Sequence, residues 1–319
     1  MNLLQQISQN KKLCKPVIYG ISGTVLTDEE KYFFSQNGCV GFIIFARNII
    51  NKAQLKSLVA SLKELMGGET LILVDQEGGR VARLKDPYWK LYPAGEFFAS
   101  LYQENKAFAL DAIYKNFQEI ADDLMEVGIN VDCAPVLDIL TPITHKIIGD
   151  RAYGDNVEQV VDLAKKVCEG LLSKNVYPVI KHIPGHGRAA CDSHLELPKV
   201  DASLEDLRKT DFAVFQKFSE QKFAMTAHVL FTALDAENCA TVSPKIIKLI
   251  REEIGFKNIL MSDDLSMKAL GGSFASRTNS VLNAGCDLVL HCNGDMNEMQ
   301  EINSVLPIIG EKVLEKFRD

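Results

Sequence analysis

Short apolar runs recur along this chain, and each gives way to polar residues before a helical pattern begins. Residues 40–46, Val-Gly-Phe-Ile-Ile-Phe-Ala, would be apolar on both faces of a strand, as in parallel sheets that helices cover. Eight such runs occur, near residues 17–21, 40–46, 70–74, 130–138, 177–180, 223–230, 258–261 and 287–291. They predict an α/β fold, with a closed parallel (β/α)8 TIM-like barrel as the leading architecture and a doubly wound open sheet as the alternative.

Helical patterns lie between the apolar runs. Thr27 with Glu30 has the spacing of a capping box, and Ser243 followed by Pro244 is a favourable helix start. We expect helices over residues 27–36, 52–65, 105–127, 156–172, 201–218, from 243 onward, around 280–284 and over 308–317. No internal repeat or linker rich in Pro, Gly and Ser is found, so residues 1–319 are expected to form a single barrel domain, with residues 1–15 and the C-terminal helix peripheral.

The composition limits the classes of partner. At 319 residues, of which 47% are hydrophobic, the chain is long enough to bury a large core. Its formal net charge of -7 and the lack of a block of Lys and Arg disfavour nucleic-acid binding. Small or neutral ligands are more natural partners, and no obligate protein partner is indicated.

The N-terminal residues and the cysteines bear on localisation. Residues 1–15 intersperse apolar side chains with Asn, Gln and Lys, so they lack the continuous apolar core of a secretory signal. No apolar run approaches the roughly 20 residues that a membrane span requires. The eight cysteines include no C-x-x-C pair, which is typical of reduced thiols. We therefore expect a cytoplasmic protein that does not associate with membranes.

Polar residues stand where the predicted strands end, and they are the first candidates for a functional site. They are Asp75, Asp138, Lys181, His182, His228 and Asp263. Because the carboxyl ends of all strands of a parallel barrel meet at one mouth, these side chains are expected to converge there. Asp263 and Asp264 would point to opposite sides of an extended segment, so one could act while the other anchors the loop.

Residues 181–194 contain three of the six histidines. His182 and His186 have the i, i+4 spacing of zinc ligands on a helix, but the Pro-Gly pair between them excludes that helix. Asp192 lies two residues before His194, close enough for its carboxylate to fix the imidazole tautomer and favour the protonated ring. The pair is a candidate for proton transfer, with a simple loop hydrogen bond as the alternative.

Charge is unusually dense after the third predicted strand. The stretch 75–80, Asp-Gln-Glu-Gly-Gly-Arg, with Arg83 just beyond, gathers two carboxylates and two guanidiniums around a Gly-Gly turn. It could form a polar ligand site or only a salt-bridged turn. Arg151, in the loop after the fourth predicted strand, is a possible ligand clamp, with a surface arginine as the alternative.

These carboxylates, guanidiniums and histidines suit hydrolysis or group transfer on a polar, hydroxyl-rich substrate. Neither G-x-x-x-x-G-K-[ST] nor a strand-anchored G-x-G-x-x-G is present for a nucleotide. A metal hydrolase is an alternative, with His182, His228 and Asp263 as possible ligands, although the first predicted strand carries no H-x-H pair.

Several motifs taken together are similar to those of one family. Residues 181–187, Lys-His-Ile-Pro-Gly-His-Gly, with Asp-Ser-His at 192–194, resemble the signature of glycoside hydrolase family 3 in its bacterial β-N-acetylglucosaminidase branch. The family's order is also followed by residues 75–81, 149–151, 225–228 and 262–267, and the resemblance extends from about residue 17 to 295. It implies a barrel enzyme that uses no metal or other cofactor.

The resemblance also implies a retaining, two-step glycosidase. Asp263 would be the nucleophile that forms a glycosyl-enzyme, and His194, supported by Asp192, would be the acid/base. A cationic imidazole can protonate the leaving oxygen and, once neutral, deprotonate water. Most retaining glycosidases instead use two carboxyl groups about 5 to 5.5 Å apart.

Five sugar-binding positions are implied as well. Asp75 would bind sugar hydroxyls. The N-acetylglucosamine subsite would be lined by Arg83, Arg151, Lys181 and His182. The chain departs from the family pattern at Ile183, where Phe is commoner, and at Ala152-Tyr153, where Ser-Phe is usual. These departures concern the packing of the pocket and not its chemistry.

Members of this branch that have one domain and no export signal are cytoplasmic enzymes of peptidoglycan recycling, so the resemblance implies that anhydro-muropeptides are the substrates and lose their non-reducing N-acetylglucosamine. A phosphorylase with the same residues is an alternative, since a histidine acid/base does not repel phosphate as a carboxylate would. A non-catalytic sugar-binding module is the alternative of another class, and it is disfavoured because Asp263, Asp192 and His194 are all present.

Overall fold

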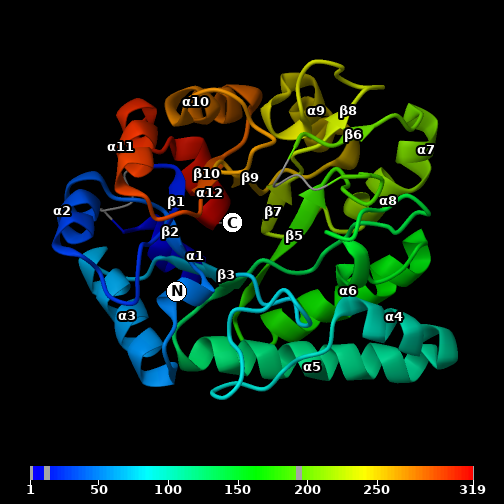
Figure 1. Cartoon of the computed structure of the whole chain (residues 1–319), viewed down its shortest axis with the longest axis horizontal. Coiled ribbons are helices and arrows are strands. Elements are labelled where there is room, and N and C mark those ends of the chain that lie inside the picture. The colour runs from blue at the N-terminus through cyan, green and yellow to red at the C-terminus, as the bar shows by residue number, and fades with distance from the viewer. Residues whose placement is uncertain (1–2, 11–14, 192–195, 319) are drawn as a thin grey trace.

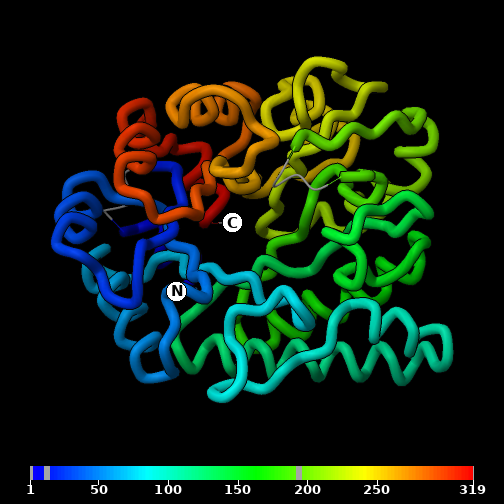
Figure 2. Tube along the Cα trace, viewed as in Figure 1, coloured from blue at the N-terminus to red at the C-terminus, as the bar shows by residue number. Residues whose placement is uncertain are grey.

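The computed structural model describes residues 3–10, 15–191 and 196–318, and within them eight parallel strands close into a barrel (Figure 1). In chain order the strands are β1 (Val17–Gly20), β2 (Gly41–Ile44), β3 (Leu71–Val74), β4 (Val131–Asp132), β5 (Tyr177–Ile183), β7 (Phe223–Thr226), β9 (Ile259–Asp264) and β10 (Leu288–His291). The barrel closes where β1 pairs with β10, with Val17 opposite Val289. Figure 2 shows this closure as the blue start of the chain lying beside its red end. The predicted TIM-like barrel is confirmed, and the open sheet is excluded.

Helices join successive strands and form the outer layer. They are α2 (Asp28–Asn37), α3 (Lys52–Leu65), α4 (Gly95–Glu104), α5 (Lys106–Glu126), α6 (Val157–Leu172), α7 (Leu204–Lys209), α8 (Asp211–Gln216), α9 (Pro244–Leu249), α10 (Phe274–Ala284) and α11 (Met296–Val305). The predicted capping box is present, because the Thr27 hydroxyl accepts from the Glu30 N–H at 3.1 Å and Glu30 accepts from the Thr27 N–H at 2.8 Å. Short single turns are η1 (Ala46–Asn48), η2 (Gly149–Arg151), η3 (Ala240–Val242) and η4 (Ile250–Ile254).

The core has two apolar layers, because successive side chains on a strand point to opposite faces. Ile18 belongs to the cluster inside the barrel, whereas Tyr19 packs in the layer between strands and helices. At the amino ends of the strands, α1 (Leu3–Ser8) and α12 (Glu311–Arg318) contact each other. Their side chains Leu4 and Phe317 join the inner cluster, so this end of the barrel is filled by apolar groups.

One predicted helix is divided in the structure. The helix predicted over 201–218 is two short helices, α7 and α8, that meet at Thr210, whose φ of -121° and ψ of -85° are not helical. The Thr210 hydroxyl contacts the Asp206 carbonyl at 2.7 Å and the Asp211 carboxylate at 2.7 Å. A threonine that bonds its neighbours in this way competes with a continuous helix.

The apolar runs 130–138 and 223–230 also do not form continuous barrel strands. In the first run the strand itself covers Val131 and Asp132, Pro135 has no N–H to give to a ladder, and pairing returns as an isolated bridge between Val136 and Lys181. The second run leaves the barrel after Thr226, and its end forms β8 (Leu230–Phe231), which pairs with β6 (Lys199–Val200) in a separate two-stranded sheet. Apolar character alone does not distinguish residues that pair in the barrel from residues that pair in the separate sheet.

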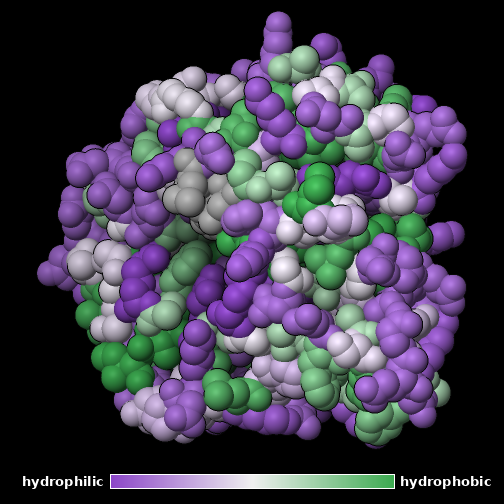
Figure 3. All heavy atoms as spheres, turned by 45° about the vertical axis from the view of Figure 1, so that its right-hand side comes forward, coloured by the Kyte–Doolittle hydropathy of each residue, from purple (hydrophilic) through white to green (hydrophobic). Residues whose placement is uncertain are grey.

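One face of the molecule is mainly polar. Hydrophilic side chains predominate on the face shown in Figure 3, and hydrophobic ones occur in separate smaller groups. Within the described ranges, no helix combines the length and apolar character needed to cross a membrane.

Candidate active site

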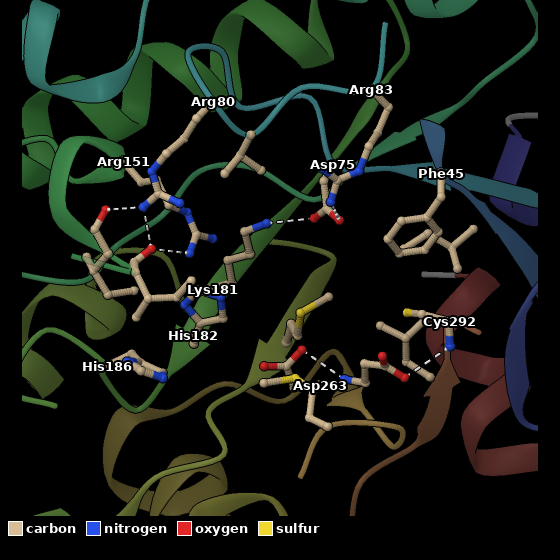
Figure 4. A pocket seen from close by; sticks show the side chains of 18 residues that line it. Phe45, Asp75, Arg80, Arg83, Arg151, Lys181, His182, His186, Asp263 and Cys292 are labelled. Atoms are coloured by element: carbon tan, nitrogen blue, oxygen red, sulfur yellow. Dashed lines mark hydrogen bonds and ion pairs between the residues drawn. The ribbon is translucent and has the colours of Figure 1, made fainter. Parts of the chain in front are cut away.

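A pocket of about 330 Å³ lies at the carboxyl ends of the barrel strands (Figure 4). Its charged and imidazole lining consists of Asp75, Arg80, Arg83, Arg151, Lys181, His182, His186, Asp263 and Asp264. Its apolar lining includes Phe45, Ile147, Met225 and Met267. Six residues that the sequence singled out, Asp75, Arg83, Arg151, Lys181, His182 and Asp263, are thus brought together in one cavity.

Lys181 is the centre of an ion network on one wall of this pocket. Its Nζ, on β5, lies 2.9 Å from Asp75 Oδ1 and 2.6 Å from Glu77 Oε1, and its side chain is only 2% exposed. Burial alone would lower the pKa of Lys181, but Asp75 and Glu77 raise it above its ordinary value. The ammonium group is therefore charged, and it bridges two carboxylates that follow β3.

Two arginines complete the network. Arg151 donates two hydrogen bonds to Glu77, from Nε at 2.8 Å and from Nη2 at 2.7 Å. Arg83 donates a hydrogen bond to Asp75 at 2.9 Å. Burial would raise the pKa of Glu77, but Arg151 and Lys181 lower it to about 2. Burial would likewise raise the pKa of Asp75, yet Lys181 and Arg83 hold it well below its ordinary range. Both carboxylates are therefore ionised acceptors at neutral pH.

The structure answers the question of the charged turn at 75–83. One ion pair, between Arg83 and Asp75, lies within the turn, but its other charges reach residues of β5 and of the loop after β4, so the segment is more than a salt-bridged turn. Gly78 and Gly79 both have positive φ, of 93° and 57°, and a Cβ on Gly78 would overlap the Pro93 carbonyl. Glycine is needed here because other residues rarely adopt this backbone conformation. Arg151 is 10% exposed, so it is not a surface arginine.

His182 belongs to a buried Asp–His pair within the pocket. Its Nδ1 lies 2.7 Å from Asp138 Oδ2, and Asp138 Oδ1 accepts the His186 N–H at 2.7 Å. Burial would raise the pKa of Asp138, but His182 lowers it below its usual value. An ionised Asp138 fixes the proton on Nδ1 and leaves Nε2 of His182 as the ring atom for a ligand. Burial and the nearby His182 lower the pKa of His186 to about 4, so its imidazole is neutral at pH 7.

Asp263 and Asp264, the adjacent aspartates at the end of β9, both line the pocket, but their carboxylates make different contacts. Asp263 lines the pocket, and its Oδ1 accepts the Asp264 N–H at 2.8 Å. Asp264 Oδ1 accepts the N–H groups of Ser266 and Cys292, each at 3.0 Å. Asp264 therefore ties the loop after β9 to the end of β10.

His228 does not line the pocket, contrary to the expected convergence of strand-end groups. It is fully buried, with Nδ1 2.7 Å from the Thr241 hydroxyl and Nε2 3.0 Å from the Asp264 carbonyl. The ring supports the loop after β9 because the chain leaves the barrel at Thr226, two residues earlier. Among the residues that the structure describes, no three His, Cys, Asp or Glu side chains form a group suited to a metal ion.

Asp192 and His194, the predicted acid/base pair, lie outside the described residues. Ile183, Ala152 and Tyr153, where the chain departs from the family pattern, are all buried and do not line the pocket. Sequence reasoning did not assign Glu77 or His186 to the site. Glu77 stood within the recognised charge cluster, but its partner Arg151 is 74 residues away, and only the fold reveals that pairing.

Comparisons with known proteins agree with this architecture. Residues 6–312 match the family described as glycosyl hydrolase family 3 N terminal domain. A beta-hexosaminidase from Alkalilimnicola ehrlichii is 35% identical over 285 residues, which cover 88% of this chain and 81% of that protein. NagZ from Neisseria gonorrhoeae, solved in complex with N-trifluoroacetyl-D-glucosamine, is 32% identical with a TM-score of 0.88, over 95% of this chain and 89% of that one.

A longer relative has the same fold. The chain aligns over 100% of its length, but over only 61% of the other chain, with a glycoside hydrolase family 3 beta-N-acetylglucosaminidase from Paenibacillus sp. str. FPU-7, at 27% identity and a TM-score of 0.86. The family match spans nearly the whole chain, and the barrel places an aspartate and a dense polar network in one pocket. On these grounds the protein belongs to family 3 of the glycoside hydrolases.

Proposed function

We propose that this enzyme is a retaining, exo-acting β-N-acetylglucosaminidase that removes non-reducing N-acetylglucosamine from peptidoglycan fragments in the cytoplasm. The observation that carries the proposal is that Asp263 shares a single pocket with the network of Asp75, Lys181 and Arg151. The N-trifluoroacetyl-D-glucosamine bound by the gonococcal relative, an N-acylated glucosamine, supports the choice of sugar.

The network provides binding groups for hydroxyls. Asp75 is an ionised acceptor, and Lys181 and Arg83 are charged donors beside it. Hydrogen bonds that involve an ionised partner are roughly twice as strong as neutral ones, and they strengthen further where water is excluded. We assign Asp75, Arg83, Arg151, Lys181 and His182 to sugar binding.

The chemistry takes two balanced steps. In the first, an oxygen of Asp263 attacks the anomeric carbon, the bond to the leaving oxygen breaks, and protonated His194 gives its proton to that oxygen. In the second, neutral His194 takes a proton from water, the water oxygen attacks the anomeric carbon, and Asp263 is released. Asp192 would orient His194 and stabilise its cationic form.

Substitution of Asp263 tests the nucleophile. Asp263→Asn should lower turnover of 4-nitrophenyl β-N-acetylglucosaminide by roughly 10³-fold or more, since an amide is a poor nucleophile. Asp155→Asn, at an exposed position away from the pocket, is the matched control and should retain full activity. Full activity of the Asp263 variant, with an unchanged unfolding midpoint, would overturn the assignment.

Assay conditions separate the other candidate reactions. Hydrolysis is expected to persist with a chelator, and its loss would favour a metal enzyme. Added phosphate is expected to leave the rate unchanged, and formation of N-acetylglucosamine 1-phosphate would favour a phosphorylase. His194→Ala should lower activity toward unactivated glycosides by a larger factor than toward 4-nitrophenyl glycosides, because a good leaving group needs less protonation.

A further inference from the structure

Arg80 fastens the rim of the pocket at several points. Its Nε donates to Asp150 at 2.7 Å, and its Nη2 donates to the carbonyls of Lys146 at 2.7 Å and Ile147 at 2.6 Å. These bonds join the loop after β3 to the loop after β4, across 66 to 70 residues of sequence. We call Arg80 and Asp150, with the carbonyls of residues 146 and 147, the rim clasp.

The rim clasp is continuous with the sugar-binding network. The Ile147 carbonyl accepts from Arg80 and also from Arg151 Nη1 at 3.0 Å. Arg151 in turn holds Glu77, and Glu77 contacts Lys181. A substitution in the rim clasp would therefore disturb the positions of Arg151, Glu77 and Lys181, the charged groups that connect the clasp to Asp75.

The clasp lies on the side of the pocket away from Asp263. Figure 4 shows Arg80 and Arg151 together on one side, Lys181 and Asp75 in the middle, and Asp263 on the other side. The cavity is about 330 Å³, at the small end of the roughly 300 to 1,000 Å³ that is usual for ligand sites. This size suits one sugar ring better than a run of sugars.

The orientation of the sugar rests on the proposed function. If Asp263 attacks the anomeric carbon, that carbon lies at the Asp263 side. The hydroxyls on the far side of the ring, including that on C4, then face Asp75, Lys181 and Arg151. In a β-1,4-linked chain the preceding sugar is attached at C4, so it would extend toward the rim clasp.

We propose that Arg80, held by Asp150 and the carbonyls of residues 146 and 147, closes the C4 side of the pocket and thereby restricts the enzyme to terminal, unsubstituted sugars. Arg80 is a specificity-determining residue in this role. Its rigid guanidinium can bind a carboxylate and two carbonyls at once, which a lysine ammonium cannot do in the same geometry. Several bonds are needed, since one exposed ion pair would hold the rim weakly.

Paired substrates test the proposal: 4-nitrophenyl β-N-acetylglucosaminide and its 4-O-methyl derivative. The wild type should prefer the unmodified substrate by roughly 10- to 200-fold in kcat/KM, which is the discrimination usually seen when one extra methyl group must fit into a close-fitting site. Arg80→Ala should bring that ratio down by about tenfold or more. Asp150→Asn loosens one anchor of Arg80 and should move the ratio in the same direction by less.

Arg208→Ala is the matched control. Arg208 makes an equally well-formed, exposed pair with Glu253, at 2.6 Å and 3.0 Å, and neither residue lines the pocket. It should leave both the ratio and the rates unchanged. Thermal unfolding of each variant establishes that it is folded at the assay temperature.

Two results would overturn the inference. In one, both substrates slow equally in the Arg80 and Asp150 variants, which means that the clasp only positions Arg151. In the other, the ratio stays at the wild-type value while the variants remain active. Failure of the proposed function looks different, because then the wild type and Arg208→Ala would hydrolyse neither substrate, and the inference would fall with it.

Discussion

The two ends of the barrel are covered by opposite kinds of side chain. At the carboxyl ends, Lys181, Glu77 and Asp75 form ion pairs that are almost withdrawn from water. At the amino ends, Leu4 and Phe317 pack into an apolar cluster. Burial of apolar groups stabilises a fold directly, whereas buried ion pairs offset the cost of their own desolvation and add little net stability.

The comparison teaches where each kind of residue acts. In the proposed function, the polar network at the mouth positions charges for the sugar, and removal of one member leaves others buried without compensation. At the apolar end, Leu4 and Phe317 belong to the core and do not line the pocket. Substitutions at the two ends should therefore separate activity from stability.

The largest expected effect comes from Lys181→Met. The change leaves Asp75 and Glu77 ionised with a lost partner, so we expect a loss of roughly 3–5 kcal/mol in the free energy of unfolding together with near-complete loss of activity. Lys316→Met is the matched control at the other end, where Lys316 contacts both oxygens of Asp287 at 2.7 Å. It should retain kcat/KM. Urea unfolding and 4-nitrophenol release provide both measurements, and equal activity losses in the two variants would contradict the division of roles.

Phe317→Ala should affect stability alone. Phe317 is 1% exposed and packs against Phe223 with ring centroids 6.3 Å apart. Removing a buried aromatic ring from a close-packed core costs about 3–5 kcal/mol. The urea midpoint should fall accordingly, while KM and kcat below the transition stay at their wild-type values. A changed KM at full folding would show that the amino end influences the pocket.

Lowering the pH should reduce the free energy of unfolding through His186. Its pKa in the folded state is about 4, below the ordinary value of 6.5, so unfolding takes up a proton and stability is lost as the pH falls from 6.5 toward 4. Between pH 7 and 4.5 this group alone accounts for on the order of 2–3 kcal/mol. Glu77, with a pKa of about 2, loses its contribution only at lower pH. His186→Asn should show a correspondingly flatter pH dependence of the urea midpoint, and an identical slope would contradict this account.

The smallest expected effect is that of Asp138→Asn. An amide cannot hold the His182 proton on Nδ1 as a carboxylate does, and loss of a charge-assisted hydrogen bond costs about 1.5–3 kcal/mol. That corresponds to roughly a 10- to 100-fold decrease in kcat/KM. A variant that loses stability but keeps the wild-type kcat/KM would show that Asp138 is structural only.

The sequence by itself determined the barrel and the composition of its mouth. Apolar runs and capping signals are local features, so eight strands and most helices could be placed from them, and Asp75, Lys181, His182 and Asp263 could be assigned to one edge because all parallel strands end there. The same local reasoning failed where an apolar run can either continue a barrel strand or leave the barrel, because both have the same apolar pattern. Residues 223–230 are mostly apolar, yet only the first four stay in the barrel.

Only the tertiary structure decided which charged groups meet. The Arg151–Glu77 and Lys181–Asp75 pairs join residues 74 and 106 positions apart, and barrel closure and strand register bring them into contact. It also placed His228 beneath the Asp264 loop instead of in the pocket, and it placed Arg80 on the rim beside Arg151. A sequence pattern specifies which face or end a residue occupies, but partners across the barrel depend on the three-dimensional path of every segment between them.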